Sequence, residues 1–145
     1  MDEKDLQILN ILRRNGRSTG PELSRLTRLP STTVHNRVKR LEKEGIIRGY
    51  AAVLDPQKMG RAVSAFVLVS VHYPGIRHFS QDEVARKIKA LPGVEQVAVV
   101  AGESDLILQA SVEDITALNR LVTEQLRAIP GVDKTRTMVI LNQIE

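Results

Sequence analysis

The sequence contains no cysteine and no tryptophan, and its 145 residues include only two tyrosines and two phenylalanines. Without cysteine the chain has no disulfide, no cysteine-bound zinc or iron–sulfur cluster, and no cysteine nucleophile. No segment approaches the ~20 consecutive apolar residues of a membrane-spanning helix, and the polar start Met1–Asp5 differs from a signal peptide. We therefore expect a soluble, cytoplasmic protein with no membrane partner.

Positive charge is concentrated in the first third of the chain. Residues 1–50 contain 11 Lys and Arg against 6 Asp and Glu, whereas residues 51–145 contain 10 against 11. A local excess of this kind is typical of a surface that binds a polyanion, because phosphate contacts need clustered Lys and Arg side chains. The alternative interpretation is an ordinary solvated surface.

Two short helices are predicted at the N-terminus. Apolar residues recur with helical spacing over residues 3–14. Thr19 and Glu22 have the spacing of a capping box, which predicts that a second helix begins there. The apolar side chains of Leu23 and Leu26 are expected to face the core of this region.

A third helix is predicted over residues 31–44, with Ser31 as its N-cap and Gly45 after its end. Its inward-facing residues are Val34, Val38 and Leu41. The opposite face and its flanks carry hydroxyl, amide and basic side chains, namely Ser31, Thr32, Thr33, His35, Asn36, Lys39, Arg40 and Lys43. Arg37 lies nearer the core, so we expect it to contact a phosphate or an intramolecular carboxylate rather than a base.

The second and third helices, joined by the short turn at residues 27–30, have the organisation of a helix-turn-helix. Asn36 can bond an adenine edge, Lys39 can bond guanine, and Thr32 offers a methyl group to thymine. The sequence therefore predicts that the third helix enters the major groove of double-stranded DNA. Non-specific, architectural DNA binding and an ordinary surface helix are the alternatives.

Residues 46–54 are extended in character and predict a strand that leads out of the first domain. The next six residues, 55–60, contain Asp-Pro and Gly, which mark a turn at a domain boundary. The predicted organisation is a helix-turn-helix domain at 1–48, a linking strand and turn at 49–60, and a second domain at 61–145.

An internal repeat organises the second domain. The segment 89–95, Lys-Ala-Leu-Pro-Gly-Val-Glu, recurs 38 residues later as Arg-Ala-Ile-Pro-Gly-Val-Asp. Each copy ends a predicted helix and begins a predicted strand; the helices are expected at 82–91 and 113–128, and the strands at 62–73, 94–101, 105–112 and 135–144. Two β-α-β units in this order predict a ferredoxin-like βαββαβ sandwich, so that the whole chain is of the α+β class.

The first of these strands has apolar residues on both faces. Phe66 and Leu68 point away from the face that the domain's own helices would cover. A strand that is apolar on both sides usually has both sides covered. We therefore expect a homodimer in which the two sheets face each other; a flat ligand on this face is the alternative.

Taken in order, these features resemble the Lrp/AsnC (leucine-responsive regulatory protein/asparagine-synthesis regulator) family of transcription factors along the whole chain. The matching stretches are residues 2–12, 16–18, 29–40, 41–47, 49–50 and 101–105. The resemblance implies a winged-helix-like DNA-binding domain joined to a ferredoxin-like effector and assembly domain. It also implies dimers that associate further, often into octamers, and a location on the nucleoid.

The resemblance further implies an amino-acid effector site around the hairpin at 101–105, between the sheet domains of neighbouring dimers. Carried over to this chain, its residues are Gly102, Glu103, Ser104, Asp105, Thr135 and Thr137. Hairpin N–H groups and hydroxyls can bind a carboxylate, and a side-chain carboxylate can bind an ammonium. Alternatively, Gly102 and Asp105 only form the turn.

The sequence contains no pattern of catalytic or metal-ligating residues. His35 belongs to the basic helix, and His72 and His78 are six residues apart, which is a poor spacing for a metal pair. No nucleophile with an adjacent base and no phosphate-binding glycine loop is visible. We expect a non-enzyme with no cofactor and no metal; a siroheme decarboxylase subunit, similar in architecture to these regulators, is the enzyme alternative.

Overall fold

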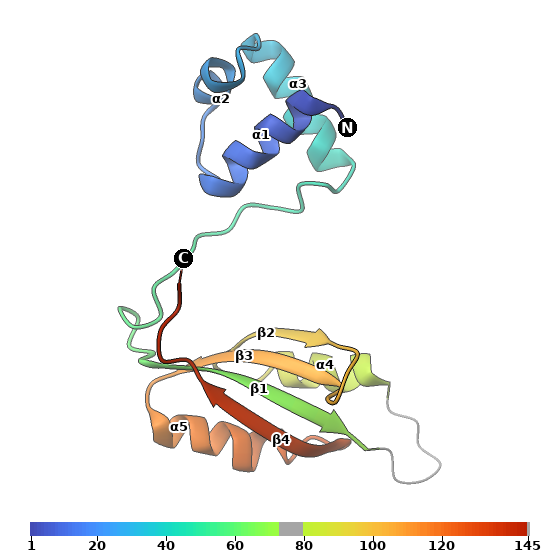
Figure 1. Ribbon diagram of the computed structural model, residues 1–145, viewed down its shortest axis with the longest axis vertical. Coiled ribbons are helices and arrows are strands. Elements are labelled where there is room, and N and C mark those ends of the chain that lie inside the picture. The colour runs from blue at the N-terminus through green and yellow to red at the C-terminus, as the bar shows by residue number, and fades with distance from the viewer. Residues whose placement is uncertain (73–79, 145) are drawn as a thin grey trace. The chain divides into compact units, whose positions relative to one another are not determined.

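The computed structural model describes residues 1–72 and 80–144 and forms two compact units, Met1–Val53 and Leu54–Glu145. Figure 1 shows that the first unit is entirely helical and that the second contains the sheet. No helix among the described residues is long and apolar enough to cross a bilayer. His78 lies outside the described residues.

The N-terminal unit contains α1 (Glu3–Arg14), α2 (Gly20–Thr27) and α3 (Ser31–Lys43). Both predicted bounds of the first helix are confirmed, and the capping box of α2 is formed by the two predicted residues. The three helices share one small core, which contains Ile8, Leu23, Val34 and Leu41.

Two details of this unit differ from the prediction. Leu26 is 53% exposed, and Thr27 is buried instead, because its hydroxyl donates to the carbonyl of Leu23 at 2.7 Å and needs no water. Ser31 is not the N-cap of α3: Pro30 takes that position, and Ser31 is the first helical residue. The extended backbone that Pro30 adopts supplies the turn into the helix without a side-chain cap.

The predicted strand at 46–54 is absent, which corrects the sequence interpretation. Gly45 adopts a positive φ of 70° and ends the third helix as expected. The N–H groups of Ile46 and Ile47 then donate to the carbonyl of Leu41, within the helix end. A strand requires a neighbouring strand for its hydrogen bonds, and no such neighbour is present beside these residues in the described chain.

The C-terminal unit contains a four-stranded antiparallel sheet in the order β2-β3-β1-β4. The strands are β1 (Val63–Val71), β2 (Val94–Val99), β3 (Leu106–Val112) and β4 (Val132–Val139). This order, with both outer strands placed beside a partner from the other β-α-β unit, is that of the ferredoxin-like sandwich. The predicted fold class is therefore observed.

Two helical segments cover one face of the sheet, as Figure 1 shows: α4 (Gln81–Lys89), and α5 (Ile115–Arg120), which continues as the π-helical segment η1 (Leu121–Leu126). The core joins Val67 and Val69 of the sheet to residues of both segments, including Ile88 and Leu121. The predicted helix at 113–128 is thus shorter than expected and changes its geometry halfway.

The internal repeat has a structural counterpart. Gly93 and Gly131, the glycines of the two Pro-Gly pairs, have φ values of 82° and 97°, and each leads directly into a strand. A Cβ atom at Gly93 would lie 3.0 Å from Val112, and one at Gly131 would lie 3.2 Å from Val84. Both positions therefore require glycine for backbone conformation and for space.

Candidate DNA-binding surface and ligand sites

The outward face of α3 is open to solvent. The predicted DNA-contacting residues Ser31, Thr32, His35, Asn36, Lys39, Arg40 and Lys43 are exposed, and Thr33 is half-buried. Within the described residues, the side chains of His35, Asn36 and Lys39 make no hydrogen bond or ion pair. These three groups are therefore free to bond a partner from outside the unit.

Arg37 and Arg40 have carboxylate partners inside the unit. Arg37 donates to Asp5 at 2.8 Å and to Asp2 at 2.6 Å, and Arg40 donates to Asp5 at 2.6 Å. For Arg37 the expectation of an intramolecular carboxylate is met. These bonds join α3 to the first turn of α1 and leave Asp5 only 1% exposed.

The charge of Asp5 is strongly favoured in the folded protein. The hydrogen bond from the backbone N–H of Asp2 lowers the pKa of Asp5 to about 2, aided by the guanidinium groups of Arg37 and Arg40 and opposed by burial. The bond from Arg37 also lowers the pKa of Asp2. The carboxylates thus remain charged at neutral pH and hold α3 against α1.

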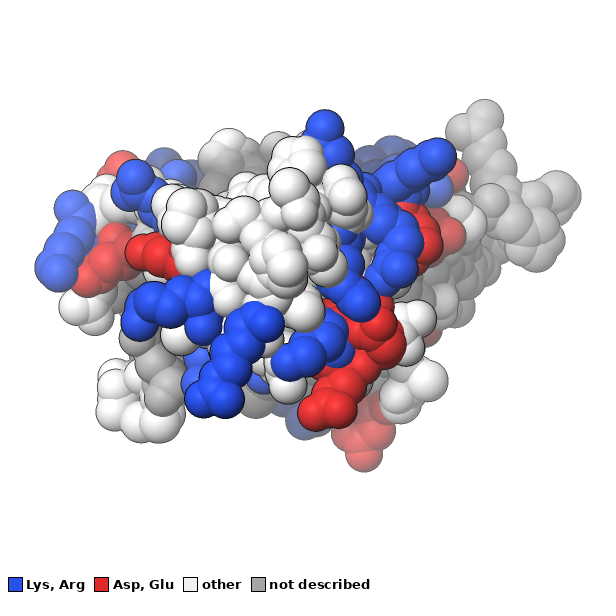
Figure 2. Space-filling model, turned by 90° about the horizontal axis from the view of Figure 1, so that it is seen from above, with Lys and Arg blue, Asp and Glu red and all other residues white. Residues whose placement is uncertain are grey.

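Further exposed basic residues lie on α2 and at its C-cap, in the turn that leads to α3. Figure 2 views the N-terminal unit from the side where α2 and α3 meet, and it shows Lys and Arg side chains gathered around an uncharged centre. Arg25 in the last turn of α2 and Arg28 at its C-cap are exposed. The sequence analysis did not assign these two residues to the DNA-binding surface, although basic residues in the turn of a helix-turn-helix are the available signal.

Tyr50 ties the chain leaving α3 back to that helix. Its hydroxyl donates to Glu42 at 2.9 Å, and its ring lies beside Gly16, where an added Cβ would be 3.7 Å from the ring. Burial, together with the bond to Glu42, raises the pKa of Tyr50. The neutral phenol is therefore the form that fixes the exit of the chain from this unit.

The face of the sheet opposite the helices carries the two residues predicted for the dimer interface. Phe66 lies across from Gln109 and Met138, and Leu68 lies across from Ile107 and Arg136. Phe66 and Leu68 are half-buried, while the alternate residues of the same strand are fully buried beneath the helices. The structure thus places an apolar stripe on a sheet face that no described element of this unit covers.

The hairpin at 101–105 is held by Asp105. Its carboxylate accepts a bond from the backbone N–H of Val71 at 2.7 Å and one from Gln81 Nε2 at 2.8 Å. Gly102 has a φ of 154°, which favours glycine, while Glu103 is exposed and Ser104 is half-buried. Asp105 therefore has a structural role, while the side chains of Glu103 and Ser104 have no hydrogen-bond partner among the described residues.

Thr135 and Thr137, the other predicted effector residues, lie on β4. Thr135 pairs with Val69, whose carbonyl accepts a bond from the N–H of Asp105 on its other side. The hairpin and Thr135 therefore lie at the same end of the sheet, on either side of β1. Thr137 is two pairs further along the strand, across from Val67, and is exposed.

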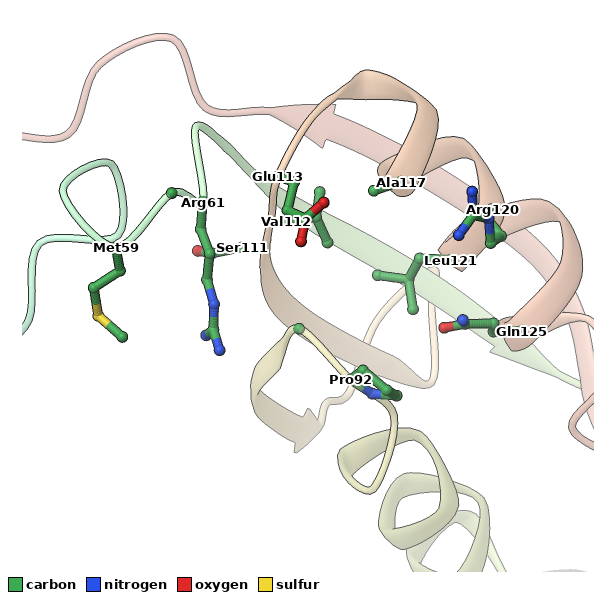
Figure 3. A pocket seen from close by; sticks show the side chains of 12 residues that line it. Met59, Arg61, Pro92, Ser111, Val112, Glu113, Ala117, Arg120, Leu121 and Gln125 are labelled. Carbon is green, nitrogen blue, oxygen red and sulfur yellow. The ribbon is translucent and has the colours of Figure 1, made fainter.

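A cavity of about 440 Å³ opens at the other end of the sheet, far along β3 from the hairpin. Figure 3 shows side chains that line it, from the turn before β1, the Pro-Gly turn, the end of β3 and the α5–η1 segment. Arg61, Glu113, Arg120 and Gln125 supply its polar groups. These residues are scattered over 65 positions of the chain and form no motif, so the sequence alone did not indicate them.

Comparison with known families divides the chain into two parts. Residues 1–48 match the winged helix-turn-helix DNA-binding domain, and residues 64–145 match the Lrp/AsnC ligand binding domain. The boundary between the two matches falls in the segment that joins the two compact units.

Individual relatives match along nearly the whole chain. The leucine-responsive regulatory protein of Escherichia coli K12 is 33% identical over 145 residues, which cover 100% of this chain and 87% of that protein. An HTH-type transcriptional regulator of Pyrococcus furiosus is 38% identical over 139 residues, covering 96% of this chain and 91% of the relative.

Solved structures of transcriptional regulators are also similar to this chain along its whole length. A transcriptional regulator from Neisseria meningitidis, crystallised as a complex with L-Met, superimposes with a TM-score of 0.89 at 32% identity and covers 100% of this chain and 92% of that chain. The leucine response regulatory protein of Mycobacterium tuberculosis gives a TM-score of 0.82 at 30% identity, with 100% and 95% covered.

Proposed function

Because the chain belongs to the Lrp/AsnC family of transcriptional regulators, we propose that it regulates transcription by reading a specific DNA sequence with α3. The proposal assigns residues 1–48 to DNA binding, 49–60 to the link between domains, and 61–145 to effector binding and assembly. The observation that supports it is the exposed face of α3, where the side chains of His35, Asn36 and Lys39 have no partner among the described residues.

The side chains on this face divide into two roles. Asn36 and Lys39 are exposed, have no partner in the part of the chain that the structure describes, and have the chemistry to bond adenine and guanine edges. Arg25 and Arg28 are exposed in the last turn of α2 and at its C-cap, and they have the chemistry to bond phosphates. Arg37 and Arg40 hold the helix against α1 through Asp5, so that the base-reading groups project from a fixed support.

Binding to a DNA fragment selected from the genome, compared with a scrambled duplex, tests this division. Asn36→Ala and Lys39→Ala should each weaken binding to the selected duplex by about 1–3 kcal/mol, with a much smaller effect on the scrambled one. Lys89→Ala, the same change on exposed helix α4 of the other unit, is the matched control. Failure of the wild-type protein to bind any duplex at low salt would refute the proposal.

We also propose that the protein acts as a homodimer whose sheets face each other through Phe66 and Leu68. The uncovered apolar stripe on β1 supports this arrangement. Two-fold symmetry would then place two copies of α3 about 34–36 Å apart on a pseudo-palindromic site. Assembly to an octamer is part of the same proposal and rests on the family.

The proposed effector is an amino acid bound at the hairpin that contains Glu103 and Ser104. L-Met in the Neisseria meningitidis regulator supports this class of ligand. In this chain Glu103 is exposed, and Thr135 lies at the same end of the sheet, so both are available to a ligand held between neighbouring subunits. To test the effector proposal separately from the DNA contacts, DNA affinity is measured with and without added amino acids. Glu103→Ala should lose the effect of the amino acid and still bind DNA.

A further inference from the structure

The cavity between β3 and the α5–η1 segment has the size and chemistry of a small-molecule site. Its volume of about 440 Å³ falls within the range of roughly 300–1,000 Å³ that is usual for ligand pockets. Its floor includes Leu121, which is 2% exposed, and its rim includes the side chain of Met59. The cavity lies within one unit of one chain, at the opposite end of β3 from the proposed effector hairpin.

Three charged side chains line this cavity: Arg61, Glu113 and Arg120. Within the described residues, none of the three takes part in an ion pair. In Figure 3 the two arginines lie at opposite ends of the cavity, with Glu113 and Leu121 between them. The cavity thus presents two separate cations and one anion above an apolar floor, and its net charge of +1 favours an anionic ligand.

Leu121 and Gln125, which both line the cavity, lie in the π-helical segment η1. In an α-helix, residues four apart are offset by about 40° around the axis, and this offset accumulates along the helix. In the wider turn of η1, the rotation about the helix axis between residues four apart is closer to one full turn. Leu121 and Gln125 therefore face the cavity on the same side of the helix as Ala117. π-helical turns occur frequently at functional sites, because they realign side chains in this way.

We propose that this cavity binds a dicarboxylic α-amino acid, with glutamate as its simplest probe. Each carboxylate is bound by one of the two arginines, at opposite ends of the cavity, and the ammonium is bound by Glu113. Leu121 contacts the methylene groups, and the Gln125 amide offers a further hydrogen bond. Two carboxylates and one ammonium match two guanidinium groups and one carboxylate in number and in sign. This site is separate from the hairpin and does not depend on the proposed DNA readout.

Calorimetric titration of the full-length protein with L-glutamate, L-glutamine and 2-oxoglutarate tests the assignment. Glutamine replaces one carboxylate by an amide, and 2-oxoglutarate lacks the ammonium, so each should bind at least about tenfold more weakly than glutamate. Arg120→Gln and Arg61→Gln should weaken glutamate binding by a similar factor. Arg127→Gln, on an exposed residue beyond η1 that does not line the cavity, should leave it unchanged.

The outcomes separate this site from the hairpin. Glutamate binding that survives Glu103→Ala but is lost in Arg120→Gln supports the cavity, provided that the variant keeps its circular dichroism spectrum. No binding of glutamate by the wild-type protein, equal binding in Arg120→Gln, or equal affinity for 2-oxoglutarate would overturn the proposal. Neither of the two arginine variants should change binding to DNA, so a failure here leaves the DNA-binding proposal intact.

Discussion

Asp5, buried in the first turn of α1, accepts a hydrogen bond of 2.8 Å from Arg37 in the middle of α3. Its second oxygen accepts one of 2.6 Å from Arg40. A single carboxylate therefore fixes two arginines of the helix proposed to read DNA, and with them the rotation of that helix against α1. This contact therefore also sets the direction in which the exposed residues Asn36 and Lys39 point.

Replacing Asp5 by Asn should lower the melting temperature at neutral pH by at least several degrees, because both arginines lose a charged partner. The folded-state pKa of about 2 lies below the ordinary value of 3.8, so the charged carboxylate stabilises the fold above about pH 4. This contribution is lost as the pH falls towards 2. Melting curves over pH 2–7 should therefore show the two proteins converging in acid.

The matched control for this experiment is Glu44→Gln. Glu44 lies 3.8 Å from Arg40 on the surface, with both side chains about half exposed, and exposed pairs of this kind contribute little to stability. Its melting curves should follow those of the wild-type protein. A constant difference between Asp5→Asn and wild type at every pH would show that the charge of Asp5 is not what stabilises the contact.

The sequence predicted the exposed face of α3 well, because helical periodicity depends only on the spacing of Val34 and Leu41, which are both buried as expected. For Arg37 it predicted either a phosphate or an intramolecular carboxylate, and the second alternative is observed. It did not identify Asp2 and Asp5 as the partners, since they lie more than 30 residues away and only the packing of α1 on α3 brings them close.

Arg28 is strained: it adopts a left-handed conformation with a φ of 56°, the only non-glycine residue with positive φ among those described. This conformation costs an L-residue about 1–2 kcal/mol, whereas glycine adds roughly 0.4–1 kcal/mol of chain entropy to the unfolded state. Arg28→Gly should therefore raise stability by up to about 1 kcal/mol in urea unfolding.

The same substitution tests the proposed phosphate contact. Loss of one cation at a phosphate should reduce the slope of log affinity against log salt by about 0.9. Arg28→Lys retains the charge and the strain, so it should keep both the wild-type slope and the wild-type stability. A stabilised Arg28→Gly protein with an unchanged salt slope would remove Arg28 from the DNA-binding surface.

Phe66→Glu should dissociate the protein into monomers in analytical ultracentrifugation. Phe66 points away from the helix-covered core, so the charge would enter the proposed interface, where it has no partner, and the fold of each subunit should persist. Thr123→Glu places the same charge on the exposed side of η1, in the helical layer that covers the other face of the sheet, and is the control. If Phe66→Glu sediments like the wild type, the two sheets do not face each other through this stripe.

Two boundaries show what the sequence could and could not supply. The last strand begins at Val132 rather than 135, and the repeat offset of 38 applied to Val94 gives this position, so the information was present but unused. The error in the expected strand at 46–54 has another cause. Its residues have strand character, but strand formation depends on a partner that local sequence does not specify. The cavity is likewise invisible, because its wall is assembled from four separate segments.

Asp105→Ala should destabilise the protein in the absence of any ligand, by about 1–3 kcal/mol, because Val71 N–H and Gln81 Nε2 lose their acceptor. The expectation from family resemblance is instead that Asp105 binds the effector directly. Glu103→Ala separates the two roles, since Glu103 is exposed and its loss should leave the unliganded melting temperature unchanged. Melting both variants with and without the twenty amino acids makes the comparison. The structural role would be contradicted if the unliganded Asp105→Ala protein were as stable as the wild type and its response to ligand were abolished. Asp105 would then bind the effector directly.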